Sequence, residues 1–177
     1  MDMTEKVLAS KVMFEGRIFT VHVDDVELPD GSKSKREIVE HHGGVGIIAV
    51  DEDKNVFIVR QYRAPFSEVL SEIPAGKLEA GEDPYKCGIR ELEEETGFRA
   101  DKIVHLGEYY PSPGYCHEKI NIYLATELHK VGQHLDSGEF LEVDKIPLDT
   151  LYDMVMDNKI GDAKTAIAIL KAKAILG

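Results

Sequence analysis

Apolar and polar residues alternate along the first part of the chain, across residues 7–39. A repeat of two residues is typical of strands that bury one face and expose the other. The run Pro29-Asp30-Gly31 interrupts the alternation and has the composition of a tight turn. We therefore predict antiparallel strands joined by a hairpin, followed by a break in the chain at Gly43-Gly44.

Shorter apolar runs follow this break, and we predict strands there as well. They cover residues 45–50, 55–60, 68–73, 102–109, 120–126 and 140–143. Pro74-Ala75-Gly76 has the residues of a loop and should end the third of these strands. Helices are predicted in three segments, residues 84–96, 147–156 and 162–175.

The first predicted helix has clear signals at both ends. Asp83 can cap it, and Pro84 suits the first helical position, where no backbone N–H is needed. Gly97 is a natural terminator. Since strands and helices do not alternate regularly along the chain, we predict an α+β fold and argue against Rossmann and TIM-barrel folds.

Composition narrows the possible partners. The chain of 177 residues has 43% hydrophobic and 31% charged residues, which fits one globular domain with a small extension. Its net charge of -12 disfavours a nucleic-acid partner, because an acidic surface repels a phosphate backbone. A metal ion or a local arginine cluster could still attract a small phosphate compound to one site.

The sequence predicts neither export nor membrane insertion. Residues 1–11 lack the basic-then-apolar pattern of a signal peptide, and no apolar run approaches the ~20 residues of a membrane-spanning helix. Cys87 and Cys116 do not form a CxxC pair, so we expect two reduced thiols and no zinc site. A cytoplasmic location is the resulting expectation.

Three carboxylates share one face of the first predicted helix. Glu94 and Glu95 follow Glu91 by three and four residues, and side chains at this spacing are neighbours. Their charges repel each other, and a cation held between them would remove that cost. Hard oxygen ligands suit Mg²⁺ or Mn²⁺, and Mg²⁺ shares its coordination shell with water and substrate phosphates. Arg90 could orient one of these carboxylates.

An acidic run alone is more typical of a solvated helix face, and the wider spacing decides between the two interpretations. Residues 76–98 read glycine, five residues, glutamate, seven residues, Arg-Glu, an aliphatic residue, any residue, Glu-Glu, any residue, glycine and an apolar residue. This pattern resembles the Nudix box at every fixed position, namely Gly76, Glu82, Arg90, Glu91, Leu92, Glu94, Glu95, Gly97 and Phe98.

The resemblance implies both a fold and a metal site. Nudix proteins are α/β/α sandwiches in which the box forms a loop, a helix and a loop. By resemblance, Glu91, Glu94 and Glu95 would bind the divalent cations together with the backbone carbonyl of Ala75. Cations there would polarise phosphoryl oxygens and lower the pKa of an attacking water. Glu91 and Glu95 are thereby candidate catalytic residues.

Segments outside the box resemble one branch of the family, the ADP-ribose pyrophosphatases. They are Lys35-Arg36-Glu37, Arg60-Gln61-Tyr62-Arg63, Glu72-Ile73-Pro74-Ala75-Gly76, Ser112-Pro113-Gly114 and Asp162-Ala163-Lys164-Thr165. This resemblance implies substrate contacts from Arg36, Glu37, Arg63, Pro113 and Gly114.

Some of these residues also have a purely structural interpretation. Pro113 can simply stiffen its loop, and Arg63 can be a surface charge. We favour a substrate contact for Arg63, because an acidic chain needs a cation to meet a diphosphate. For Arg36 the two interpretations are about equal. His117 departs from the commoner pattern after Ser-Pro-Gly and is more typical of a loop histidine than of a metal ligand.

The general base of this branch comes from an acidic loop late in the domain. Residues 133–142 match that loop in position and composition, and we expect Glu139 to be the base. Asp136 and Glu142 are the alternatives, of which Glu142 fits a strand better.

The predicted reaction is the Mg²⁺-dependent hydrolysis of ADP-ribose to AMP and ribose 5-phosphate. One alternative is another nucleoside diphosphate sugar, such as GDP-mannose or ADP-glucose. Another is a non-catalytic module that senses ADP-ribose or NAD, although such modules tend to lose box glutamates. Members of the branch dimerise through an exchanged N-terminal strand region. We therefore expect a homodimer, with residues 1–42 as the dimerisation element and residues 43–177 as the Nudix hydrolase domain.

Overall fold

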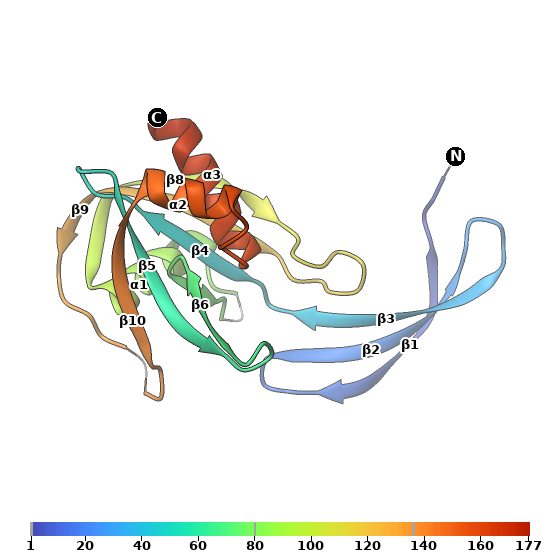
Figure 1. The fold of residues 1–177 in the computed structure, drawn as a ribbon. Helices are drawn as coiled ribbons and strands as arrows, with labels where there is room; N and C mark the ends of the chain where they lie inside the picture. The colour runs from blue at the N-terminus through green and yellow to red at the C-terminus, as the bar shows by residue number, and fades with distance from the viewer. Residues whose placement is uncertain (1, 80, 136) are drawn as a thin grey trace. The chain divides into compact units, whose positions relative to one another are not determined.

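The structure, a computed structural model, describes residues 2–79, 81–135 and 137–177. Its backbone contacts divide the chain into two compact units. The first unit comprises Met1–Gly43 and Tyr110–Lys119, and the second comprises Gly44–Tyr109 and Ile120–Gly177. Figure 1 follows the chain through both, from the blue amino-terminal strands to the red carboxyl-terminal helix. Within the described residues, every helix is too short or too polar to cross a membrane.

The first unit is built on an antiparallel sheet. Strands β1 (Lys6–Glu15), β2 (Phe19–Glu27) and β3 (Lys33–His41) are hydrogen-bonded in this order. The predicted hairpin turn is confirmed, because Gly31 adopts a φ of 83° and donates to the carbonyl of Leu28 at 2.9 Å. A parallel bridge between Val39 and Cys116 joins the loop Tyr110–Lys119 to β3.

The second unit contains two sheets. In one, the strand order is β10-β5-β6, and in the other it is β7-β4-β9-β8. Strands β4 and β9 run parallel, whereas the other paired strands of this unit run antiparallel. The bounds are β4 (Gly44–Ala49), β5 (Asn55–Arg63), β6 (Glu68–Glu72), β7 (Ala75–Lys77), β8 (Phe98–Tyr109), β9 (Ile120–Lys130) and β10 (Leu141–Pro147).

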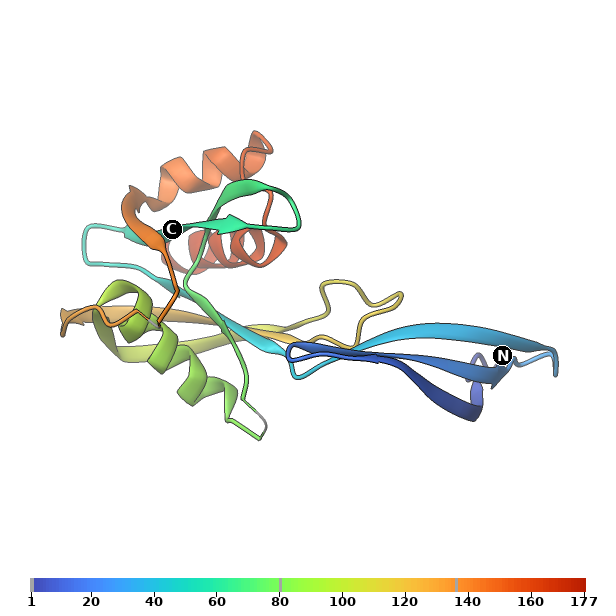
Figure 2. The ribbon, with the colours of Figure 1, turned by 90° about the horizontal axis from the view of Figure 1, so that it is seen from below.

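Helices cover both faces of the larger sheet, as Figure 2 shows. On one face, Val45 and Ile47 of β4 pack with Leu92 of helix α1 (Pro84–Thr96). On the other face, Ile48 of β4 packs with Leu151 of α2 and Ile169 of α3. These helices span Leu148–Met156 and Ala163–Leu176. Because alternate residues of a strand point to opposite faces, the fully apolar β4 serves both layers. The predicted α/β/α sandwich is confirmed.

Several predicted element bounds are wrong. Ala75 and Gly76 do not form a loop but belong to β7, which pairs antiparallel with Gly44–Gly46 of β4. The pairing partner is distant in sequence, so local composition could not reveal this strand. Strand β8 begins at Phe98 rather than at residue 102, β9 continues to Lys130, and β10 runs from Leu141 to Pro147. Cys87 and Cys116 are unbridged, as expected.

Candidate functional site

Helix α1 carries the acidic residues, and its ends form as the sequence predicts. The carboxylate of Asp83 accepts hydrogen bonds from the N–H groups of Tyr85 at 2.9 Å and Lys86 at 3.2 Å. At the other end, Gly97 adopts a φ of 75° and donates to the carbonyl of Glu93 at 2.8 Å. A glycine suits this left-handed conformation, which favours residues without Cβ. The capped helix therefore gives the acidic row a fixed support.

Glu91 lies against the backbone of β7, where a glycine leaves room for it. A Cβ atom added at Gly76 would stand 1.7 Å from Oε1 of Glu91, so a larger residue would displace this carboxylate. The Glu91 side chain is 12% exposed. Burial raises the pKa of Glu91, and the nearby charges of Glu94 and Glu139 add to this effect against the opposing influence of Arg90. The environment therefore disfavours the charged form unless a cation is present.

Glu95 is more deeply buried than Glu91. Its residue is 2% exposed, and its Oε2 accepts a hydrogen bond from the N–H of Ala75 at 3.0 Å. Burial, together with the charges of Glu91 and Glu139, raises the pKa of Glu95 to about 8. The contact joins α1 to β7, so both segments that we expect to bind metal meet at this point.

Arg90 supplies positive charge to the acidic row. Its Nη1 donates to Oε1 of Glu91 at 2.8 Å and to Oε2 of Glu94 at 2.9 Å, and its Nε donates to Oε1 of Glu82 at 3.3 Å. One guanidinium therefore faces three carboxylates. Partial burial by itself would lower the pKa of Arg90, but the hydrogen bonds that it donates to Glu82 and Glu94 and the charge of Glu91 raise this pKa. Arg90 thus contacts two of the three carboxylates that it could orient according to the sequence, and its role toward a metal ion stays a prediction.

These carboxylates fit a divalent cation in chemistry, although the described side chains are not already arranged around one. No group of three His, Cys, Asp or Glu side chains among residues 2–79, 81–135 and 137–177 has the geometry to hold a metal ion. Glu91 and Glu94 instead bind Arg90. The donors are nevertheless hard carboxylate oxygens in excess of positive charge, which is the set that Mg²⁺ prefers. Cation binding would require Glu91 and Glu94 to exchange part of their contact with Arg90.

Glu91 also lines a cavity of about 310 Å³ in the second unit. Glu139, which follows β9 in the chain, reaches the same cavity and accepts a hydrogen bond from Nε2 of Gln61 at 3.3 Å. The complete lining is Gln61, Arg63, Ala75, Gly76, Lys77, Glu79, Arg90, Glu91 and Glu139.

Arg63 lines this cavity while it is held by a buried carboxylate. Its Nε and Nη2 donate to the two oxygens of Glu72 at 2.6 and 2.8 Å. Glu72 also accepts a hydrogen bond from Lys164 of α3. The hydrogen bonds with Glu72 raise the pKa of Arg63, so it stays charged beside the cavity. Arg63 is therefore not an isolated surface charge. It forms an ion pair with Glu72, which neutralises part of its charge.

Glu72 should make the stability of the protein sensitive to acid. Burial by itself would raise its pKa, but Arg63 and Lys164 outweigh burial and lower the pKa of Glu72 from 4.5 to about 2. The folded carboxyl thus binds its proton more weakly than the unfolded one. Its stabilising contribution is fully present above pH 4.5 and is lost as the pH falls from about 4.5 to about 2.

The size of this contribution is on the order of 3 kcal/mol, from the shift in pKa. Urea unfolding between about pH 2 and pH 7 measures it as a fall in the free energy of unfolding below pH 4.5. The variant Glu72→Gln should be less stable at neutral pH and should show a flatter profile in acid. If the acid profile of the variant matched that of the wild type, other carboxylates would be responsible.

Four of the expected substrate residues lie in the first unit. Arg36 and Glu37 are on β3, where Nε of Arg36 donates to Oε2 of Glu5 at 2.9 Å. Pro113 and Gly114 are exposed in the loop Tyr110–Lys119. Their role in substrate binding stays a prediction.

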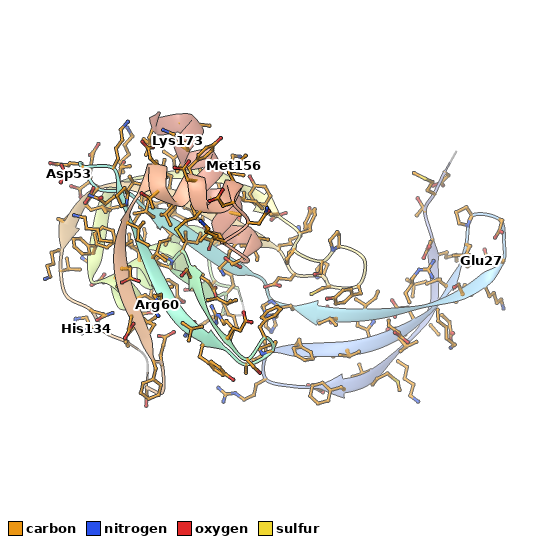
Figure 3. All side chains as sticks on the ribbon, in the orientation of Figure 1. Glu27, Asp53, Arg60, His134, Met156 and Lys173 are labelled. Atoms are coloured by element: carbon orange, nitrogen blue, oxygen red, sulfur yellow. The ribbon has the colours of Figure 1, made fainter. Side chains whose placement is uncertain are left out.

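The two alternatives to Glu139 differ in what the structure describes. Asp136 lies outside the described residues. Glu142 is on β10, as the sequence favours, and its side chain is 77% exposed. Arg60, labelled in Figure 3, lies 3.3 Å from it, between Nη1 and Oε2. Glu142 does not line the cavity that contains Glu91 and Glu139.

Sequence reasoning missed several cavity residues, and strand alternation could have found one of them. Gln61 is two residues before Arg63 on β5, so both side chains belong to one face of the strand. Both line the cavity with Glu91, whereas Arg60 and Tyr62 line a different one. Lys77 and Glu79 carried no comparable signal, because their place depends on the pairing of β7 with β4.

The sequence profile of the NUDIX domain matches residues 40–166, which is more than half of the chain. A profile for a nucleoside diphosphate sugar hydrolase N-terminal domain matches residues 5–39.

Individual proteins are similar over almost the whole chain. The ADP-ribose pyrophosphatase of Bacillus subtilis (strain 168) is 43% identical over 93% of this chain and 90% of that protein. The methanol dehydrogenase activator of Bacillus methanolicus is 42% identical, also over 93% and 90%. A crystal structure of an ADP compounds hydrolase shares the fold with a TM-score of 0.86 at 24% identity, and the match covers 99% of this chain and 96% of that one.

Proposed function

Because this chain belongs to the Nudix hydrolase family, we propose that it hydrolyses the diphosphate of ADP-ribose to AMP and ribose 5-phosphate. The main observation in support of this proposal is that Ala75 and Gly76 of β7, Glu91 of α1 and Glu139 line the same cavity. Metal-binding candidates and a candidate base thus face the same space. The choice of ADP-ribose is supported by the 43% identity to an ADP-ribose pyrophosphatase.

Glu91, Glu94, Glu95 and the carbonyl of Ala75 would hold a divalent cation, Mg²⁺ or Mn²⁺. The raised pKa values of Glu91 and Glu95 support this assignment, since a bound cation would offset the burial of their charges. So does the close approach of Glu91 to Gly76. The bound cation would neutralise phosphate charge, polarise the phosphoryl oxygens and lower the pKa of a bound water.

The remaining cavity residues have distinct roles in the proposed reaction. Glu139 accepts a proton from the attacking water, and its hydrogen bond with Gln61 orients the carboxylate. Arg63 balances charge on the phosphate oxygens, which grows as the leaving group departs. Arg90, which donates to Glu91 and Glu94 in the metal-free structure, would stay beside these carboxylates and orient them after they exchange part of this contact for the cation.

A homodimer is proposed as the active form, with residues 1–42 as the dimerisation element and residues 43–177 as the hydrolase domain. All ten residues of β1 are exposed. They include Val7, Val12, Met13 and Phe14, each between 54% and 58% exposed, and exposed apolar rows of this kind favour association. Sedimentation equilibrium should give twice the chain mass of 19.8 kDa. A monomeric mass would exclude this role for residues 1–42.

Arg36, Glu37, Pro113 and Gly114 remain our proposed substrate contacts from the first unit. Alanine variants of Arg36 and Glu37 should raise KM for ADP-ribose, and unchanged values would remove them from the substrate site.

A cytoplasmic location is also proposed. It is supported by the absence of a disulfide between Cys87 and Cys116 in the structure, since disulfides are rare in cytosolic proteins. A fractionation experiment that found the protein outside the cytoplasm would exclude it.

A substrate panel tests the proposed reaction. With Mg²⁺ present, the wild-type protein should release AMP from ADP-ribose with a kcat/KM at least about tenfold above the values for ADP-glucose, GDP-mannose and NAD. Chelation by EDTA should abolish release. Preference for GDP-mannose or ADP-glucose would replace ADP-ribose as the substrate. Binding of ADP-ribose in calorimetry without any cleavage would instead favour a sensing module.

A further inference from the structure

A line of charged side chains connects helix α3 with the cavity. Lys164 is near the start of α3. Its Nζ binds Oε2 of Glu72 and lies 3.0 Å from Oδ2 of Asp162. Glu72 in turn holds Arg63 through two hydrogen bonds of 2.6 and 2.8 Å. Arg63 lines the cavity together with Glu91. Lys164 is thus one carboxylate away from a residue that faces the diphosphate site.

Lys164 is held in a defined position. Its side chain is 13% exposed and that of Glu72 is 3% exposed, so bulk water has little access to this ion pair. Asp162 is fixed as well, because it caps α3 by accepting a hydrogen bond from the N–H of Thr165 at 3.0 Å. The hydroxyl of Thr165 accepts one from the N–H of Ile73 at 2.8 Å, next to Glu72. The start of α3 is therefore bonded to the end of β6.

The charges of this group explain why a lysine is useful there. Without Lys164, Glu72 would form a neutral pair with Arg63 alone, and Arg63 would attract a phosphate only weakly. Lys164 shares the negative charge of Glu72, so Arg63 retains more of its own. The charge of Asp162 is balanced in part by the amino end of α3, where helix dipoles favour anions. Arg63 therefore keeps more of its positive charge than it would in an isolated pair with Glu72.

Glu72 occupies two of the three guanidinium nitrogens of Arg63, its Nε and Nη2. Among the described residues, Nη1 makes no hydrogen bond and is available to a substrate oxygen. A bidentate arginine can turn little around its carboxylate, so the orientation of Glu72 also decides where Nη1 points. Lys164 contacts the same Oε2 atom that accepts from Nη2.

From these contacts we propose that Lys164 is a positioning residue for diphosphate binding: through Glu72 it orients Arg63 and preserves its positive charge toward the cavity. The inference rests on the proposed function, since it takes the diphosphate to be the group that Arg63 meets. Lys164 itself does not touch the substrate in this account. Its loss should weaken binding of the diphosphate more than it slows the chemical step.

The test compares two lysines of the same helix. Lys164→Met removes the charge and keeps the length of the side chain. Lys171→Met is the matched control, because Lys171 is also on α3 and bonds to the hydroxyl of Tyr109 at 2.9 Å, a residue that does not line the cavity. We expect Lys164→Met to raise KM for ADP-ribose about tenfold with kcat within about twofold. Lys171→Met should leave both values unchanged.

Binding measurements and a conservative variant separate positioning from a loss of structure. Calorimetry with AMP and with inorganic diphosphate, both with Mg²⁺, should show weaker binding to Lys164→Met by a similar factor. Lys164→Arg retains the charge and should recover most of the affinity. Unchanged KM and unchanged affinities in Lys164→Met would overturn the proposal. Equal losses in Lys164→Met and Lys171→Met, in proportion to their melting temperatures, would overturn it too.

If Lys164→Met does not fold, Lys164→Gln replaces it under the same criteria, since glutamine is uncharged but can still donate to Glu72. If the wild-type protein cleaves no member of the substrate panel, the proposed function fails. The binding of inorganic diphosphate then still decides whether Lys164 supports an anion site at Arg63.

Discussion

Replacing Glu95 with glutamine should lower kcat/KM by on the order of 10³-fold while leaving the melting temperature of the metal-free protein unchanged or higher. Glutamine has nearly the same shape, and its carbonyl oxygen can still accept the hydrogen bond from Ala75 that Glu95 accepts at 3.0 Å. The substitution thus removes the charge that would hold the cation. A loss of several kcal/mol in transition-state stabilisation is expected from a missing metal ligand.

The expected stability follows from the sign of the pKa shift. The pKa of Glu95 is raised from 4.5 to about 8 by burial, then by the charges of Glu91 and Glu139. A carboxyl that holds its proton more tightly when folded destabilises the fold at pH values above its unfolded pKa. At neutral pH without metal, removing this group therefore relieves a cost. Activity and stability should move in opposite directions.

Glu93→Gln is the control for this experiment. Glu93 lies on the same helix, but its carboxylate pairs with Arg99 of β8 at 2.6 Å, whereas that of Glu95 bonds to Ala75 of β7. Its variant should keep near-normal kcat/KM. Steady-state kinetics with Mg²⁺ and thermal melts with EDTA measure the two effects. A Glu95→Gln variant that kept its activity would exclude Glu95 as a metal ligand, and one that melted earlier would contradict the charge argument.

Glu139→Gln should reduce kcat by about 10²-fold to 10⁴-fold, which is the usual contribution of a general base. The affinity for Mg²⁺ should change much less, because the expected ligands are on α1 and β7 whereas Glu139 lies between β9 and β10. The amide can still hydrogen-bond to Gln61, so the position of the side chain should be preserved. Initial rates over a range of Mg²⁺ concentrations separate kcat from the metal activation constant.

Glu142→Gln is the matched control for the base. Glu142 is the alternative from the same acidic segment, but it is 77% exposed and pairs with Arg60. Its variant should keep most of the turnover. Near-normal turnover in Glu139→Gln would remove Glu139 from the mechanism. A large loss of kcat in Glu142→Gln would transfer the role of base to Glu142.

The fold was largely predictable wherever neighbours in sequence determine structure. The caps at Asp83 and Gly97 depend on residues within one turn of α1, and both form as predicted. The hairpin at Gly31 is equally local. Strand β7 could not be predicted, because it exists through its pairing with β4 and its own residues, Ala75–Lys77, have no strand pattern.

The candidate site was also predictable in part, namely where neighbours in sequence determine its geometry. The sequence by itself determined that Glu91, Glu94 and Glu95 share one face of a helix, because helical periodicity places residues three and four apart side by side. The spacing around them also determined the family. Glu139 could be chosen from its segment through resemblance, but its place at the cavity with Glu91 depends on how distant segments pack.

Tertiary structure alone decided how the charges are shared. Only the packing of β7 on α1 places Glu91 over Gly76 and buries Glu95 beside Ala75, which raises the pKa values of both carboxyls. Lys164 meets Glu72 although the two are 92 residues apart. Periodicity reports which side chains share a face, whereas desolvation and ion pairing depend on the residues that other elements bring to that face.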